Sequence, residues 1–211
     1  MKTRFTLTSL ALASLMMMGN TAMAAPINSG TSDFFNVKLT LTGSCETFVV
    51  NHGQATPIAS AADPIAGADI DFGEHKAQKN SAELTGNNSG NTTQGIQVNC
   101  SKNTVFKVHL EPQNHQSADG SGKLKGLLGT SNTDEIEYQL YKPEITGVGL
   151  NETIGGISAI KWGKEQNSLS LTGKGLDTPI MLPVFAKIPQ DKLSDKTPDT
   201  YQDRVTVTLT Y

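Results

Sequence analysis

Apolar and polar residues alternate along many short stretches of this chain, and most regularly near its two ends. The two alternating sets are Phe35, Val37, Leu39 and Leu41 near the start, and Val205, Val207, Leu209 and Tyr211 at the end. Strict alternation over such a length indicates a strand with one face turned towards a core. We therefore expect strands at residues 35–42 and 201–211.

The same kind of pattern recurs between these two ends. Further strands are predicted at residues 47–51, 68–72, 82–85, 95–100, 104–111, 135–142, 157–162, 168–172 and 180–188. Stretches rich in Gly, Asn, Asp, Ser and Pro separate them, and the longest predict loops at residues 53–67, 86–94 and 113–122. About ten short strands between turn signals favour an all-β sandwich or barrel.

The first 24 residues have the composition of a secretory signal. Lys2 and Arg4 precede an apolar run, and Ala22 and Ala24 provide a small-x-small cleavage site. The apolar run is shorter than the roughly 20 residues that span a bilayer, so a retained anchor is the weaker alternative. We expect a flexible leader at residues 25–34, one domain over residues 35–211, and no membrane span in the mature chain.

Net charge and cysteine content limit the classes of partner and the cellular compartment that we expect for this protein. Without the signal, 15 basic and 20 acidic residues remain, which gives a charge of −5 and argues against a nucleic-acid partner. Cys45 and Cys100 both lie in the exported part, and an even count in an oxidising compartment predicts one disulfide. Two unpaired buried thiols, or a metal site, are the weaker alternatives.

Residues for catalysis or for binding a cofactor or metal are not found at the spacings that such sites need. The histidines (His52, His75, His109 and His115) are scattered, and no nucleophile elbow or phosphate loop occurs. Asp69 and Asp71 alternate with Ile70 and Phe72, as on the wet face of a strand. Trp162 fits a core position better than a sugar platform. The sequence predicts neither an enzyme nor a cofactor.

Several segments together resemble the spore coat protein U domain family, which includes the pilins of archaic chaperone–usher pili of the Csu type. The segments that carry the resemblance are residues 37–45, 70–73, 96–100, 182–189 and 201–211. Members often have a Gly shortly before the tyrosine at position 201, whereas this chain has Pro198, Asp199 and Thr200. The run from His52 to Gly67 is also longer than the family leads us to expect.

The resemblance implies an incomplete immunoglobulin-like β-sandwich that is completed by a donated N-terminal strand. Residues 35–42 would be the donor strand, with Phe35, Val37, Leu39 and Leu41 entering pockets of the next subunit. The acceptor groove, which the chaperone fills first, would be lined by Val205, Val207, Leu209 and Tyr211.

The partners that the family implies are other pilin subunits in a head-to-tail homo- or hetero-polymer, a periplasmic chaperone and an outer-membrane usher. The protein would pass through the periplasm to a pilus on the cell surface, for attachment or biofilm formation. Three alternatives stay open: a sugar- or surface-binding tip protein, a secreted coat protein, and a monomeric carbohydrate- or surface-binding sandwich. In the last two, residues 35–42 would be the first strand of a self-contained fold.

Overall fold

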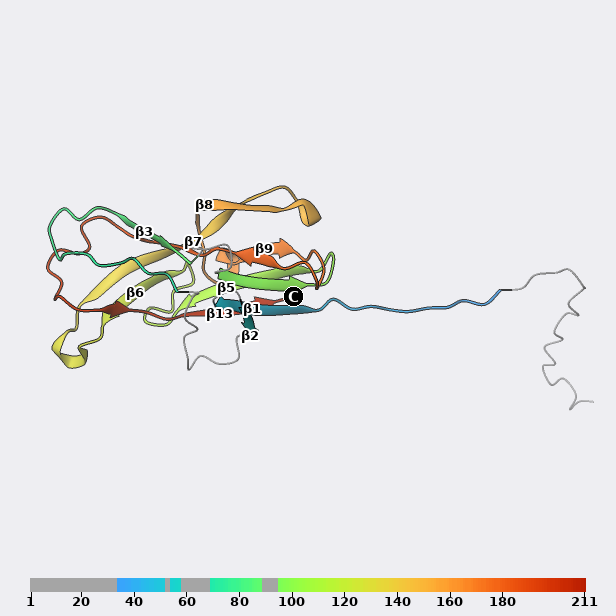
Figure 1. Cartoon of the computed structure of the whole chain (residues 1–211), viewed down its shortest axis with the longest axis horizontal. Helices are drawn as coiled ribbons and strands as arrows, with labels where there is room; N and C mark the ends of the chain where they lie inside the picture. The colour runs from blue at the N-terminus through green and yellow to red at the C-terminus, as the bar shows by residue number, and fades with distance from the viewer. Residues whose placement is uncertain (1–33, 52–53, 58–68, 89–94) are drawn as a thin grey trace, which may run out of the picture. The chain divides into compact units, whose positions relative to one another are not determined.

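A computed structural model describes residues 34–51, 54–57, 69–88 and 95–211 of the chain (Figure 1). The signal and most of the leader, which we predicted at residues 1–34, lie outside the described residues. Residues 41–211 form one compact unit, and residues 34–40 belong to a separate one. Among the described residues, no helix is long and apolar enough to span a membrane.

The compact unit is built from antiparallel strands in three sheets, which confirms the all-β prediction. Three short 3-10 helices, Gly129–Ser131, Gly149–Asn151 and Glu165–Asn167, are the helical elements of the described residues. The four-stranded sheet has the order β10 (Ile180–Leu182), β4 (Gly95–Cys100), β1 (Cys45–Asn51) and β2 (Gln54–Pro57).

The largest sheet has the order β12 (Tyr201–Gln202), β6 (Ser121–Gly126), β7 (Glu135–Thr146), β11 (Phe185–Ile188) and β3 (Leu84–Asn87), with β8 (Thr153–Lys161) also paired to β7. The three-stranded sheet has the order β13 (Val205–Thr210), β5 (Val105–Pro112) and β9 (Leu169–Thr172). Figure 1 shows β5 between β9 and β13.

The core is formed by the inward faces of these strands, as alternation predicts. Its most deeply buried apolar residues are Val98, Phe106, Val108, Leu110, Leu140, Trp162 and Leu182. Trp162 is fully buried, and its indole N–H donates to the carbonyl oxygen of Val108 at 3.0 Å. The prediction that Trp162 is a core residue is therefore confirmed.

Two predicted strands are each divided in the structure. Residues 180–188 form β10 in one sheet and β11 in another, with Pro183 and Val184 between them. Proline has no N–H to continue a ladder, and the N–H of Val184 donates instead to the side-chain oxygen of Asn88 at 2.8 Å. Residues 201–211 likewise divide at Asp203 and Arg204 into β12 and β13.

Other predictions of strands and loops were wrong in detail. Residues 113–122 were expected to be a loop, yet β6 begins at Ser121, and β2 lies inside the loop expected at 53–67. Residues 69–72, the described part of a predicted strand, are irregular, although Ile70 and Phe72 pack against the core. Residues 35–42 belong to no strand of the single chain.

The turn before Tyr201, where the sequence departs from the family that it resembles, is held by the carboxylate of Asp199. This group accepts hydrogen bonds from the N–H of Leu128 at 3.1 Å and from the side-chain amide of Asn132 at 2.7 Å. A Cβ atom at Gly126 would lie 2.5 Å from the Asp199 oxygen, so the carboxylate occupies space that this glycine leaves open. The turn before Tyr201 is therefore supported by hydrogen bonds to the Asp199 side chain.

Candidate functional site

The C-terminal strand β13 is paired along one edge. Its register on β5 joins Val205 to Pro112, Val207 to Leu110 and Leu209 to Val108. The other edge has no strand neighbour among the described residues, because β13 ends the order of its sheet. An edge strand presents a row of backbone N–H and C=O groups that another chain can pair with.

The apolar face of β13 is only half covered. Val205, Val207 and Leu209 pack against the core but remain partly exposed, whereas Val108 and Leu110 on the neighbouring strand are completely buried. Tyr211, predicted to line the same groove, follows the end of β13 and is 66% exposed. The structure therefore brings three of the four predicted acceptor residues together on one partly covered face.

The opposite face of β13 is polar. Thr206, Thr208 and Thr210 lie across from Glu111, His109 and Lys107 of β5. The Nε2 atom of His109 lies 3.0 Å from the Thr210 hydroxyl oxygen. Burial, with a smaller contribution from Lys107, lowers the pKa of His109, so the imidazole is neutral at pH 7. This face is suited to water, and the apolar face is the one that remains incomplete.

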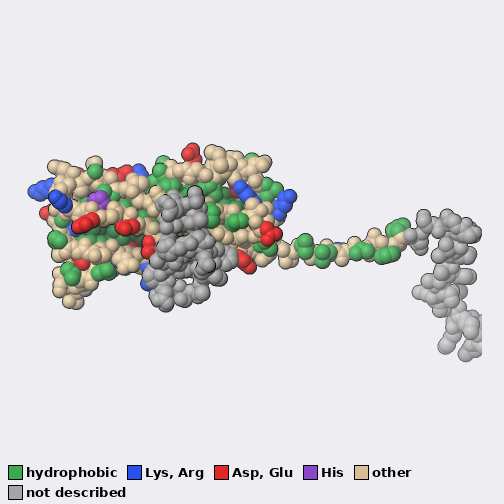
Figure 2. Space-filling view, viewed as in Figure 1, with side chains coloured by type: hydrophobic (Ala, Val, Ile, Leu, Met, Phe, Trp, Pro, Cys, Tyr) green, Lys and Arg blue, Asp and Glu red, His purple; other side chains and the backbone are tan. Residues whose placement is uncertain are grey.

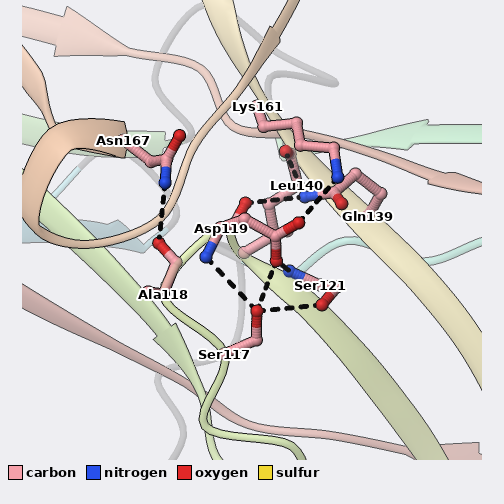
Figure 3. Close-up of polar contacts among 8 residues, drawn as sticks. All are labelled: Ser117, Ala118, Asp119, Ser121, Gln139, Leu140, Lys161 and Asn167. Carbon is pink, nitrogen blue, oxygen red and sulfur yellow. Dashed lines mark hydrogen bonds and ion pairs between the residues drawn. The ribbon is translucent and has the colours of Figure 1, made fainter.

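The connection between β5 and β6 is braced by a polar cluster around Asp119 (Figure 3). The carboxylate accepts hydrogen bonds from the Ser117 hydroxyl and from the N–H of Ser121, and pairs with the ammonium group of Lys161 at 2.6 Å. The hydrogen bond from Lys161, followed by that from Ser117, holds the pKa of Asp119 well below its ordinary value. The cluster therefore links the β5–β6 connection to Lys161 of β8, and the Asp119 carboxylate stays charged down to acidic pH.

The N-terminal segment presents its apolar side chains to solvent. Phe35, Val37, Leu39 and Leu41 are 86%, 89%, 81% and 84% exposed. Figure 2 shows hydrophobic side chains along this segment, interspersed with others. Soluble proteins rarely expose contiguous apolar surface without a partner for it. This segment therefore has the composition of a core strand and the exposure of a surface loop.

Immediately before β1, Ser44 is hydrogen-bonded to Ser101, which follows β4. The N–H of Ser101 donates to the carbonyl oxygen of Ser44 at 2.9 Å, and the N–H of Ser44 donates to the Ser101 hydroxyl at 3.1 Å. Cys45 and Cys100 form a disulfide across β1 and β4, which confirms the predicted pairing. The start of β1 is therefore fixed both covalently and by hydrogen bonds.

The titratable residues that the sequence singled out do not come together. The Nε2 atom of His75 lies 2.7 Å from the carbonyl oxygen of Phe72, and Asp71 accepts a hydrogen bond from the N–H of Gly73 at 2.8 Å. His52 lies outside the described residues. No group of three or more metal-ligating side chains occurs within the part of the chain that the structure describes.

A comparison with known protein families shows which family the chain belongs to. The model of the spore coat protein U domain matches residues 31–208. The chain belongs to this family. The resemblance read from the sequence is therefore confirmed, and the matched region includes both the exposed N-terminal segment and the first four residues of β13.

Among solved structures, this spore coat protein U domain chain is similar to the CsuC–CsuE chaperone–tip adhesion subunit pre-assembly complex from the archaic chaperone–usher Csu pili of Acinetobacter baumannii. The match has 18% identity and a TM-score of 0.41, and covers 82% of this chain. It covers 41% of the other chain, so this protein spans less than half of its length. None of the curated proteins matches.

Proposed function

We propose that this protein is a structural subunit of an archaic chaperone–usher pilus, and that its subunits polymerise by donor-strand complementation. The compact unit is then an incomplete immunoglobulin-like sandwich, and the N-terminal segment of the next subunit supplies the missing strand. The proposal is carried by one observation: β13 has a partly exposed apolar face and one edge without a strand neighbour among the described residues, and residues 35–41 of the same chain expose apolar side chains with matching alternation.

The N-terminal segment and β13 are similar in length, and their apolar side chains have the same two-residue period. Residues 35–42 reach about 26 Å when extended, and the six residues of β13 span about 20 Å. Phe35, Val37, Leu39 and Leu41 project to one side of an extended segment, where they can enter successive pockets beside Val205, Val207 and Leu209. Lys38 and Thr40 then face solvent, as the threonines of β13 do.

The energy of such an insertion is sufficient for a durable contact. Burying four large apolar side chains is worth roughly 6–12 kcal/mol as an upper bound, at about 1.5–3 kcal/mol for each. Backbone hydrogen bonds along the edge of β13 would add direction and register. Because the donor and the acceptor are different surfaces, the contact is head to tail and builds a fibre.

Assembly of this kind needs a protected intermediate, since the free edge of β13 would otherwise associate with other edges. In the pathway that we propose, a periplasmic chaperone occupies this edge first and an outer-membrane usher directs the exchange. The disulfide fits export to an oxidising compartment. The subunit would reach the cell surface in the pilus, where its role is mechanical attachment, and no step is catalytic.

The test is an SDS gel of unheated and boiled exported protein, with wild type beside Leu39→Asp and Thr40→Asp. Wild type is expected to give a ladder that collapses to monomer on boiling, and Leu39→Asp to give only monomer. Thr40→Asp, with the same charge on the other face of the segment, should retain the ladder. A single monomer band in every lane would support a self-contained secreted domain instead.

A further inference from the structure

We propose that Asp203 is a positioning residue that fixes the register of β13 on β5, and thereby the places at which the apolar face of β13 can receive a donor. The biological meaning of this inference rests on the proposed function. The register itself is a property of the single chain and can be measured whether or not the protein polymerises.

The sequence of β13 is compatible with more than one register on β5, so another residue must fix the register. We call such a residue a register pin. From Val205 to Thr210 the residues alternate strictly between apolar side chains and threonine. A slip by one residue would turn the threonines towards the core and is strongly disfavoured. A slip by two residues, however, keeps every apolar side chain inward and moves the strand by about 7 Å. Alternation alone does not oppose that slip.

Asp203 lies immediately before β13 and accepts hydrogen bonds from different parts of the chain. One oxygen, Oδ1, accepts from the N–H of Asn114 at 3.0 Å and from the N–H of Arg204 at 2.7 Å. The other, Oδ2, accepts from the Tyr138 hydroxyl at 2.8 Å. These partners belong to the β5–β6 connection, to the entry of β13 and to β7. A two-residue slip would remove the carboxylate from the first and the last of them.

The donor from β7 is placed by the packing around it. Tyr138 is buried and lies across from Gly122 of β6, where a Cβ atom would come within 2.2 Å of the tyrosine ring. Gly122 therefore leaves the space through which the phenol reaches Asp203. Burial, together with the nearby Asp203 charge, raises the pKa of Tyr138, so the hydroxyl remains a donor at every physiological pH.

The residues on both sides of Asp203 are held by the same connection. The side-chain amide of Asn114 donates to the carbonyl oxygens of Lys123 at 3.0 Å and Gln202 at 3.1 Å. The N–H of Gln113 donates to the carbonyl oxygen of Arg204 at 2.8 Å. The point at which the chain leaves β6 and joins β5 is therefore defined at three successive residues, with the carboxylate of Asp203 in the middle.

The experiment measures the register by disulfide trapping in the full exported chain. His109→Cys with Thr208→Cys places two thiols directly across the native pairing, and His109→Cys with Thr206→Cys places them across a strand slipped by two residues. The native disulfide already joins a directly opposed pair, Cys45 and Cys100, so opposed positions can be bridged in this fold. When Asp203 is present, the native pair of cysteines (positions 109 and 208) is expected to form a disulfide at least about tenfold more readily than the slipped pair (positions 109 and 206).

Replacing the carboxylate should reduce that preference. Asp203→Ala is expected to bring the two pairs within about threefold of each other, and Tyr138→Phe, which removes one of the hydrogen bonds, should shift the ratio less in the same direction. Asp134→Ala is the matched control, since that carboxylate accepts two hydrogen bonds from Thr197, away from β13. A full native preference in both Asp203→Ala and Tyr138→Phe would overturn the pin.

Binding of a synthetic peptide of residues 34–42 to the same proteins separates this inference from the proposed function. If wild type binds the peptide and Asp203→Ala binds it at least about tenfold more weakly, both proposals are supported. Wild type that binds no peptide would contradict donor exchange while the trapping result still decides the role of Asp203. Equal binding by wild type and Asp203→Ala, with native trapping in both, would overturn only the pin.

Discussion

Residues 35–41 and residues 205–211 have nearly the same alternating pattern but different environments. Val205, Val207 and Leu209 are hydrogen-bonded into a sheet through β13 and half covered by the core. Phe35, Val37 and Leu39 belong to no strand and are more than 80% exposed. The period of two is common to both, so the period does not explain the difference.

What distinguishes the two ends is their neighbourhood. The C-terminal strand has β5 along one edge and a carboxylate at its entry that accepts hydrogen bonds from three donors. The N-terminal segment is followed by an anchor, the disulfide at Cys45, but has no ladder of its own in the single chain. A strand-forming sequence becomes a strand only where a neighbour can satisfy its backbone groups.

The comparison is tested most strongly by placing the same charge in each end. Val37→Asp should abolish assembly and leave the melting temperature of the subunit unchanged, because Val37 is exposed. Val207→Asp should abolish assembly and also destabilise the subunit by roughly 2–4 kcal/mol, because the charge enters a half-buried apolar face. Gel ladders and thermal melting measure the two effects. Equal loss of stability in both variants would contradict the different environments that we describe.

The disulfide gives the next largest effect, since it holds the point where the exposed segment joins the fold. The Cys45→Ser and Cys100→Ser double variant opens a loop spanning 55 residues. The free energy of unfolding should fall by roughly 4 kcal/mol in the chain-entropy model. Urea unfolding of the exported wild type, with and without reductant, provides the matched measurement. An unchanged midpoint in the double variant would show that hydrogen bonds at Ser44 and Ser101 suffice.

The polar cluster around Asp119 gives a smaller, pH-dependent effect. Asp119→Asn should cost about 1 kcal/mol at pH 7, because the charge-assisted hydrogen bonds are partly exposed and screened. The pKa of Asp119 is lowered in the folded protein, so its contribution is complete above about pH 4 and declines as the pH falls further. The stability of wild type and variant should therefore converge in acid. Asp69→Asn, at an exposed position, is the control and should leave the free energy of unfolding at pH 7 within about 0.5 kcal/mol of wild type.

The smallest effects are expected on the polar faces of the two ends. Thr208→Ala and Thr40→Ala each remove an exposed hydroxyl while leaving the apolar face unchanged. Each should change the free energy of unfolding by less than about 0.5 kcal/mol and leave the gel ladder intact. Loss of the ladder in Thr40→Ala would mean that the donor segment is recognised through both of its faces.

Many local features of the fold were predictable from the sequence. The strand at residues 95–100 was predicted with the bounds that β4 has, because its alternation is uninterrupted. By contrast, β6 has a single large apolar residue, Leu124, and it pairs with β7, where its Gly122 leaves room for the ring of Tyr138. No property of residues 121–126 alone predicts the close approach of Gly122 and Tyr138. Asp203 lies in the segment 201–211 that carries the family resemblance, and two of its hydrogen-bond donors are more than 60 residues away in the sequence.

The sequence by itself determined the all-β class, the face of each alternating strand and the family of the chain. It also contained the cysteine pair, because these features depend on local period and on residue identity. Only the tertiary structure decided where the strands at 180–188 and 201–211 divide, which edge of β13 has no strand neighbour among the described residues, and which distant groups bond to Asp203. The physical reason is that strand pairing satisfies backbone groups between distant parts of the chain, and alternation is the same for every partner that fits.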